Sequence, residues 1–269
     1  MNLRYRAAPG QGFTPIVNRE EDGLEFLRFG LLKLGAADRW TGSTSENEEA
    51  ALVILSGRCN LKSGADRWQD LGQRENVFAG KATGAYVPPG RDFEIEATKD
   101  LEAGLCFSTR ASRGGRIAIV MPEDVKVRTA GDQTWRREVH DIIGQQVAAQ
   151  RLLVGETYNE PGKWSSYPPH KHDEESAEEV QQEEIYHFRL NPQQGFGVQR
   201  IYTADGSIDE AYTILDGDTI VIPKGYHPVV AAPGYSLYYL WMIAGRQRIM
   251  RPRDDPAHAW VKSLEVKKE

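Results

Sequence analysis

Three of the six histidines in this chain lie in two short segments that could bind one divalent metal ion. His170 and His172 are one residue apart in YPPHKHD, and His227 follows a proline and a glycine in PKGYHP. Imidazole nitrogens bind Zn²⁺, Mn²⁺ and Fe²⁺, often together with a carboxylate. In a strand, residues i and i+2 point to the same face, so His170 and His172 can reach one ion from one extended segment.

Strand parity selects the carboxylate that would complete this site. In the segment EEIYHFRL, alternate side chains form two faces. The more apolar face, which we expect to point into a barrel, consists of Glu184, Tyr186, Phe188 and Leu190. The other face consists of Glu183, Ile185, His187 and Arg189. The pattern therefore predicts Glu184 as a metal ligand and His187 as a surface or interface residue.

An acidic loop over residues 173–183 separates His172 from Glu184 by twelve positions. This length leaves Glu174, Glu175 and Glu183 as alternative ligands. The preferred set predicts one divalent metal held by His170, His172, Glu184 and His227. Zn²⁺ is the first choice, with Mn²⁺ and Fe²⁺ as alternatives, because the spacing does not decide among these metals.

Aromatic and basic side chains near these segments favour a substrate cavity over a closed structural site. Sugars stack on aromatic rings, and a sugar acid needs a cation for its carboxylate. We therefore expect a small sugar-acid substrate. The residues predicted to bind it are Arg189, Arg200, Lys224, Tyr202 and Trp241.

The elements that must position these residues are short strands separated by glycine, proline and aspartate, which predicts an all-β protein. A weak repeat pairs ALVILSGRCNL and AYVPPGRDFEIEA with AYTILDGD and TIVIPKGYHPVVAA, which indicates two tandem β-barrels. We place their boundary between residues 130 and 131. Residues 1–130 lack an H-x-H motif, so the metal chemistry should belong to residues 131–269. The segment 136–150 could form either a helix or a strand and a loop.

Composition excludes several classes of function. The chain has 269 residues, a formal net charge of −6 and a pI near 5.6, which disfavours a nucleic-acid partner. Its apolar runs are too short to span a membrane, and its first residues do not resemble a secretory signal. Cys59 and Cys106 are too few for a disulfide framework. We expect a cytoplasmic protein that could form a homo-oligomer through exposed strand edges.

The H-x-H motif, the glutamate and the later histidine after G-x5-P-x-G together resemble the cupin superfamily. The usual cupin motif has its glutamate only a few residues after the second histidine, so the twelve-residue spacing is a departure. A more specific resemblance is carried by RLLVGETYNEPGKWSSYPPHKHD, EEIYHFRL and DGDTIVIPKGYHPVVAAPGY. These segments look like the 5-deoxy-glucuronate isomerase family of myo-inositol catabolism.

This resemblance implies a bicupin of two double-stranded β-helix (jelly-roll) barrels, with a catalytic C-terminal barrel and the metal ligands His170, His172, Glu184 and His227. It also implies conversion of 5-deoxy-D-glucuronate to 5-dehydro-2-deoxy-D-gluconate, an aldose–ketose isomerisation. A metal would stabilise the charge that develops on the substrate oxygens, and a base must move the proton. Glu183, Asp173 and Tyr186 are the candidates for that base. The alternative functions are a 5-keto-4-deoxyuronate ketol-isomerase, a cupin Fe(II) dioxygenase and a non-catalytic sugar-binding cupin.

Overall fold

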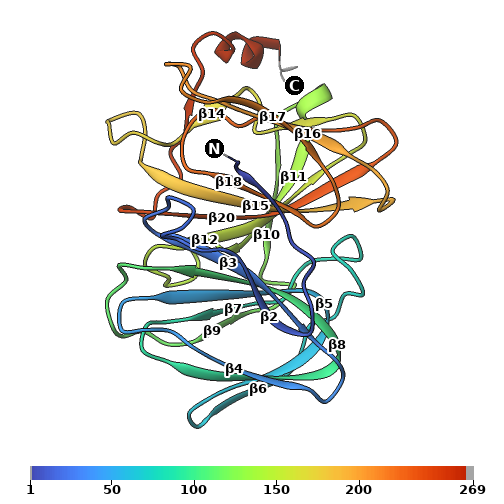
Figure 1. The fold of residues 1–269 in the computed structure, drawn as a ribbon, viewed down its shortest axis with the longest axis vertical. Helices are drawn as coiled ribbons and strands as arrows, with labels where there is room; N and C mark the ends of the chain where they lie inside the picture. Colours follow the sequence, from blue (N-terminus) through green and yellow to red (C-terminus); the bar gives the residue numbers. More distant parts are fainter. Residues whose placement is uncertain (1, 265–269) are drawn as a thin grey trace.

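The computed structural model describes residues 2–264 and consists almost entirely of β-strands, as predicted. Figure 1 shows two halves stacked along the long axis, with the earlier strands in the lower half and the later ones in the upper half. Short strands rich in β-branched and aromatic residues form both halves because such side chains pack well on a half-buried pleated surface. Two short 3₁₀ helices complete the described chain, η1 (Gln133–Trp135) and η2 (Ala259–Leu264).

The first half is built from one eight-stranded antiparallel sheet. Its strands are β2 (Gly12–Val17), β3 (Leu27–Leu34), β4 (Arg39–Ser43), β5 (Glu49–Ser63), β6 (Asp66–Leu71), β7 (Gly84–Val87), β8 (Asp92–Ser108) and β9 (Ala118–Val120). The segment ALVILSGRCNL of the weak repeat lies within the single long strand β5. Gly57 bends β5 with φ +86°, and a Cβ there would lie 1.9 Å from the Asp100 carbonyl oxygen.

The second half has a large sheet and a small sheet that face each other. In spatial order, the large sheet contains β1 (Arg4–Arg6), β18 (Asp218–Ile222), β15 (Gln182–Asn191), β20 (Ser236–Gly245), β12 (Leu153–Asn159), β11 (Arg137–Ile143) and β10 (Lys126–Ala130). The small sheet contains β13 (Trp164–Ser165), β19 (Val229–Ala231), β16 (Gly197–Tyr202) and β17 (Asp209–Ile214). A separate pair joins β14 (His170–Lys171) to β21 (Arg253–Asp254). An apolar core that includes Phe188, Ile201 and Leu237 fills the space within this half.

The large sheet of the second half takes β1 and β10 from the first 130 residues, so the sheets do not follow a division at residue 130. β1 pairs with β18, and β10 pairs with β11, although residues 4–6 and 126–130 lie in the segment predicted to be the first barrel. This part of the predicted division requires correction, because hydrogen-bonded pairing and not chain order defines the sheet. The ambiguous segment after η1 forms the strand β11, not a helix.

A second apolar core joins the halves and includes Phe29 and Leu31 from the first half and Ile185 and Leu240 from the second. His187 lies on the predicted face of β15, opposite Glu184, but that face packs against the first half. Its ring is fully buried, with a centroid 5.4 Å from that of Phe29. The interface prediction for His187 is confirmed, and the surface alternative is wrong.

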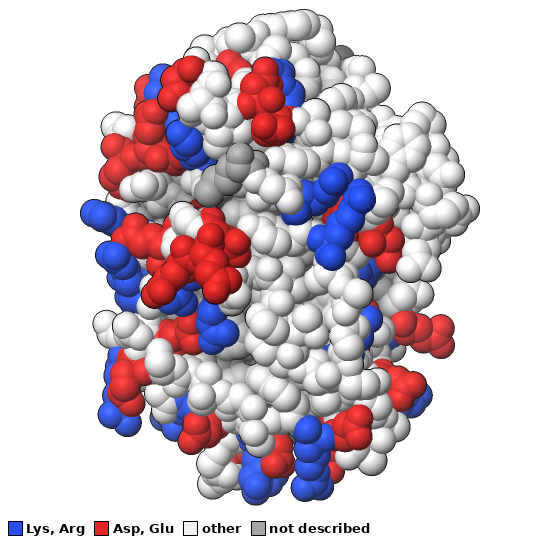
Figure 2. Space-filling model, viewed as in Figure 1, with Lys and Arg blue, Asp and Glu red and all other residues white. Residues whose placement is uncertain are grey.

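Charged side chains of both signs are mixed on the face drawn in Figure 2, where acidic and basic residues lie beside one another. This pattern agrees with a small net charge on a surface of ordinary composition. Among the described residues, neither helix has the length and apolar character needed to cross a membrane.

Candidate metal centre and its cavity

Three of the four predicted ligands meet in one buried cluster. His172 follows β14, Glu184 lies on β15, and His227 lies between β18 and β19. Their ligand atoms all lie within 4.8 Å of one another. Glu184 Oε2 is 3.1 Å from His172 Nε2 and 3.2 Å from His227 Nε2. The two imidazoles therefore converge on the carboxylate selected by strand parity.

The acidic loop closes on itself, which explains how twelve positions separate two neighbouring side chains. The backbone N–H of Gln182 donates to the carbonyl oxygen of His172 at 2.7 Å. Within the loop, buried Glu179 accepts hydrogen bonds from the amides of Asp173 and Glu174 at 2.6 and 2.9 Å. The loop thus begins and ends at the same place and delivers Glu184 beside His172, despite the departure from the usual cupin spacing.

Backbone carbonyls fix both ring orientations in the cluster. His172 Nδ1 donates to the carbonyl of Gln182 at 3.0 Å, and His227 Nδ1 donates to the carbonyl of Gly225 at 2.9 Å. In the neutral tautomer, this arrangement leaves the lone pair of each Nε2 directed toward Glu184. Two lone pairs facing a carboxylate match the needs of a divalent cation, and Nδ1 contacts of this kind orient metal-binding histidines. His227 Nε2, which is buried, has no hydrogen-bond partner among the described residues.

The electrostatics of the cluster also suit a cation. In the metal-free site, burial opposes the charged form of Glu184, but protonated Nε2 groups of the two imidazoles outweigh burial and lower the pKa of Glu184 to about 2. A metal ion would take the place of those protons. The carboxylate is therefore ionised at neutral pH, as a metal ligand must be. The donor set of two imidazoles and one carboxylate fits Zn²⁺, Mn²⁺ or Fe²⁺.

His170, the fourth predicted ligand, lies beside the cluster and not within it. Its ring centroid is 5.0 Å from that of His227 and 6.5 Å from that of His172. Burial, and then the neighbouring His227 and His172, lower the pKa of His170 well below its usual value, so its imidazole is neutral at pH 7. A neutral imidazole at this position can serve as a further ligand, which leaves the four-residue set a proposal.

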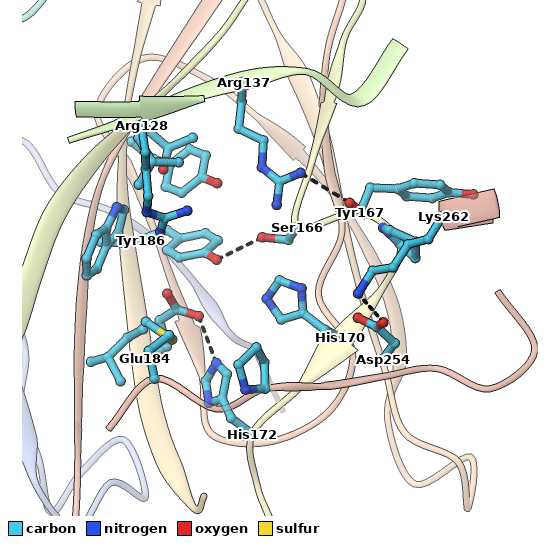
Figure 3. A pocket seen from close by; sticks show the side chains of 18 residues that line it. Arg128, Arg137, Ser166, Tyr167, His170, His172, Glu184, Tyr186, Asp254 and Lys262 are labelled. Atoms are coloured by element: carbon cyan, nitrogen blue, oxygen red, sulfur yellow. Dashed lines mark hydrogen bonds and ion pairs between the residues drawn. The ribbon is translucent and has the colours of Figure 1, made fainter. Parts of the chain in front are cut away.

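A cavity of about 260 Å³ opens directly over these side chains. Figure 3 shows His172 and Glu184 at one end, Tyr186 and Ser166 in the middle, and Arg137 at the other end. The Tyr186 and Ser166 hydroxyl groups are hydrogen-bonded at 3.0 Å. The cavity therefore joins a metal-type cluster, a hydroxyl pair and cationic groups, an arrangement that can bind an anionic substrate and transfer a proton.

Comparison with known proteins identifies the family to which this geometry belongs. A family model described as KduI/IolB matches residues 3–261. The chain belongs to the KduI/IolB family. This KduI/IolB chain is 39% identical to the 5-deoxy-glucuronate isomerase of Geobacillus thermodenitrificans, with 93% of this chain and 92% of that protein aligned. It is 37% identical to the protein of the same name from Halalkalibacterium halodurans, over 95% of this chain and 96% of that protein. The prediction of an isomerase is thereby confirmed.

Two solved structures resemble this chain, one at the level of the family and one at the level of the fold. An IolB-like protein from Salmonella typhimurium matches with a TM-score of 0.93 and 33% identity, over 97% of this chain and all of that one. The oxalate decarboxylase of Lactobacillus farciminis matches with a TM-score of 0.67 at 13% identity, over 98% of this chain and 90% of that one. The second likeness concerns the fold alone, and it confirms the predicted bicupin architecture.

The three candidate bases of this KduI/IolB protein have different surroundings. Tyr186 lines the cavity, and the cavity-lining residues that the structure describes include neither Asp173 nor Glu183. Asp173 accepts from Lys171 Nζ at 2.5 Å and from the Gly225 amide at 2.6 Å, so it anchors the loop. Glu183 lies on the opposite face of β15. These positions argue against Asp173 and Glu183 as the base.

Of the five predicted substrate-binding residues, Trp241 lines the cavity. Arg189 lies on the same face of β15 as His187, and its guanidinium bonds to Glu102 of the first half at 2.7 Å. Arg189 follows Phe188 on β15, so its side chain points away from the interior of the second half. The prediction that Arg189 binds the substrate therefore requires correction.

The other three predicted substrate-binding residues lie on the small sheet and its turns. Arg200 is exposed and pairs with Asp209 at 2.9 Å. Lys224 is exposed and donates to a serine hydroxyl of a neighbouring turn at 3.1 Å. The Tyr202 hydroxyl donates to Asp255 at 2.6 Å. None of the three is among the described residues that line the cavity, because their side chains point outward or pack under the C-terminal segment.

The sequence pattern did not point to the basic residues that line the cavity in the described part of the chain, Arg128, Arg137 and Lys262. Arg128 lies on β10 and Arg137 on β11, on either side of the predicted boundary between residues 130 and 131. Strand parity could have found Arg137, since it shares a face of β11 with the buried Val139. Ser166 was also missed, and it holds a φ of +49°, an uncommon backbone conformation for serine that aims its hydroxyl at Tyr186.

Replacing Glu183 with glutamine is expected to lower the free energy of unfolding by about 2 kcal/mol. Its carboxylate accepts hydrogen bonds from the amides of Glu25, Phe26 and Leu27, and so ties β15 to the first half. Glutamine removes the charge that strengthens these bonds. Urea denaturation followed by tryptophan fluorescence measures the loss, and the rate per folded molecule should change little.

The matched control is Glu178→Gln, which alters an exposed acid of the same loop and should stay within about 0.5 kcal/mol of the parent. If Glu183→Gln instead kept the parental stability and lost most of its turnover, Glu183 would be the base after all.

Proposed function

We propose that this protein is a divalent-metal-dependent isomerase that converts 5-deoxy-D-glucuronate to 5-dehydro-2-deoxy-D-gluconate. The supporting observation is the convergence of His172, Glu184 and His227 at the end of a cavity, in a chain aligned almost end to end with relatives named for this substrate. Myo-inositol catabolism, a cytoplasmic location and a homo-oligomeric assembly belong to the same proposal and rest on the sequence resemblance and composition.

The metal would be held by His172, Glu184 and His227, with His170 as the further ligand. When bound, it would supply Lewis-acid stabilisation of the negative charge that develops on the substrate oxygens as the carbonyl moves from C1 to C2. Zn²⁺ remains the first choice, with Mn²⁺ and Fe²⁺ as alternatives. The buried walls of the cavity exclude water and strengthen each electrostatic contact inside it.

Of the three residues considered as the base, Tyr186 is the one that we propose to transfer a proton. Burial, and then the charge of Glu184, raise the pKa of Tyr186 well above its usual value. The phenol therefore keeps its proton at neutral pH and is suited to donate to a substrate oxygen, whereas an unassisted role as base is disfavoured. Its bond to the Ser166 hydroxyl at 3.0 Å gives the donated proton a route for replacement.

Removing the metal is expected to abolish the activity, because the charge that develops on the substrate would lose its counter-charge. Protein dialysed against a chelator should convert 5-deoxy-D-glucuronate at less than about 1% of the reloaded rate, a loss of at least ~3 kcal/mol of transition-state stabilisation. Product formation is followed by ¹H NMR, and restored activity is compared among Zn²⁺, Mn²⁺ and Fe²⁺.

The same assay is repeated without oxygen. Full turnover under anaerobic conditions is expected for an isomerase and excludes the Fe(II) dioxygenase alternative. Absence of turnover with all three metals would contradict the proposal and favour a sugar-binding cupin.

A further inference from the structure

Arg137 extends into the cavity from β11, at the end away from the metal cluster. In Figure 3, its guanidinium lies across the cavity from Glu184 and His172, with Tyr186 and Ser166 between them. Arg137 is half-buried, and its neighbour on the same face, Val139, also lines the cavity. One end of the cavity therefore carries a carboxylate and imidazoles, and the other end carries a permanent positive charge.

Main-chain carbonyl groups hold this guanidinium in place. Arg137 Nη1 donates to the carbonyl oxygens of Trp135 at 3.3 Å and Tyr167 at 3.2 Å. Tyr167 directly follows Ser166, so the segment that supplies the cavity hydroxyl also orients the arginine. A guanidinium that is oriented before binding offers a planar fork of donors matched to a carboxylate.

Two further cations among the described residues that line the cavity occupy its rim. The Arg128 side chain is 52% exposed and lies 3.5 Å from Asp141. The Lys262 side chain is 54% exposed and forms an ion pair with Asp254. Exposed charges act through water and are weakened by it, so these residues are less suited than Arg137 to fix a substrate.

We infer that Arg137 binds the carboxylate of the sugar-acid substrate and thereby sets the direction in which the sugar enters. This inference rests on the proposed function. In 5-deoxy-D-glucuronate, the carboxylate and the reacting carbons C1 and C2 lie at opposite ends of the chain. A carboxylate bound at Arg137 directs C1 and C2 toward the end that holds His172, Glu184 and His227. Arg137 thus selects a uronate over the corresponding neutral aldose.

The test compares Arg137→Met, which removes the charge, with Arg137→Lys, which keeps the charge and removes the fork. The control is Arg136→Met, which removes a neighbouring exposed cation outside the cavity. The substrates are 5-deoxy-D-glucuronate and its neutral counterpart 5-deoxy-D-glucose. For Arg137→Met we expect kcat/KM for the uronate to fall about 10- to 100-fold, mainly through KM, with little change for the neutral sugar. Arg137→Lys should lie in between, and Arg136→Met should match the parent.

Binding of D-glucuronate to the metal-free protein, measured by calorimetry, gives a second readout that does not require turnover. We expect Arg137→Met to weaken this binding at least tenfold and Arg136→Met to leave it unchanged. Equal losses for both sugars, or unchanged glucuronate binding, would overturn the assignment of Arg137. If the parent failed to convert the uronate but Arg137→Met still lost glucuronate binding, the proposed reaction would fail and the acid-binding role would stand.

Discussion

Glu184→Gln is expected to reduce turnover of 5-deoxy-D-glucuronate by about three orders of magnitude, equivalent to ~4 kcal/mol of transition-state stabilisation. The substitution keeps the size of the side chain and removes its charge. That charge lies 3.1 and 3.2 Å from the Nε2 atoms of His172 and His227, so a neutral amide leaves the site without its anionic ligand. Steady-state kinetics and elemental analysis of the purified variant measure the loss of rate and of metal together.

The matched control for this prediction is Glu174→Gln. Glu174 was an alternative ligand, but its side chain is 63% exposed and pairs with Lys171 at 3.2 Å. Its replacement should leave metal content and rate close to those of the parent. A Glu184→Gln protein that retained full metal content and a rate within tenfold of the parent would contradict the ligand assignment.

Arg74→Met is expected to lower the free energy of unfolding by about 3–5 kcal/mol, the largest stability effect that we foresee. Arg74 of the first half forms a bidentate ion pair with Glu156 of β12, and the two side chains are 2% and 0% exposed. The Tyr238 hydroxyl also donates to this carboxylate at 2.7 Å. Methionine leaves the carboxylate buried without its cation, a loss comparable to much of the stability of an ordinary domain. Guanidinium chloride denaturation measures it.

A double-mutant cycle provides the control for the Arg74–Glu156 pair. Glu156→Gln alone should also destabilise, whereas Arg74→Met combined with Glu156→Gln should lose clearly less than the sum of the single losses. Additive losses within about 0.5 kcal/mol would mean that the pair does not couple the two halves.

Alternation of side chains along β15 predicted more of this protein than any other pattern. It separated Glu184, which meets the two histidines, from His187, which packs on Phe29 of the first half. It works because a strand between two apolar layers has only two side-chain directions. His172 of the H-x-H pair and His227 after the Pro-x-Gly corner complete the cluster, whereas His170 lies beside it.

The surroundings of the site could not be predicted in the same way, because they depend on contacts between distant parts of the chain. Glu183 was a reasonable candidate for the base from its local sequence. Its carboxylate instead accepts hydrogen bonds from backbone amides that lie more than 150 residues earlier in the chain. Arg137 was overlooked because it lies close to the predicted boundary between residues 130 and 131, whereas strand pairing makes β10 and β11 part of the large sheet of the second half. No pattern in residues 4–6 indicates that β1 pairs with β18, which lies more than 200 residues later in the chain.

Titration of the metal-free protein with Zn²⁺ shows whether the metal centre carries the activity, with bound metal and the initial rate of 5-deoxy-D-glucuronate conversion measured on the same samples. We expect the rate to rise in proportion to bound metal and to reach its plateau at about one equivalent per chain, through a site that Glu184→Gln removes. Full activity in the metal-free protein, or a bound equivalent that leaves the rate unchanged, would contradict this expectation.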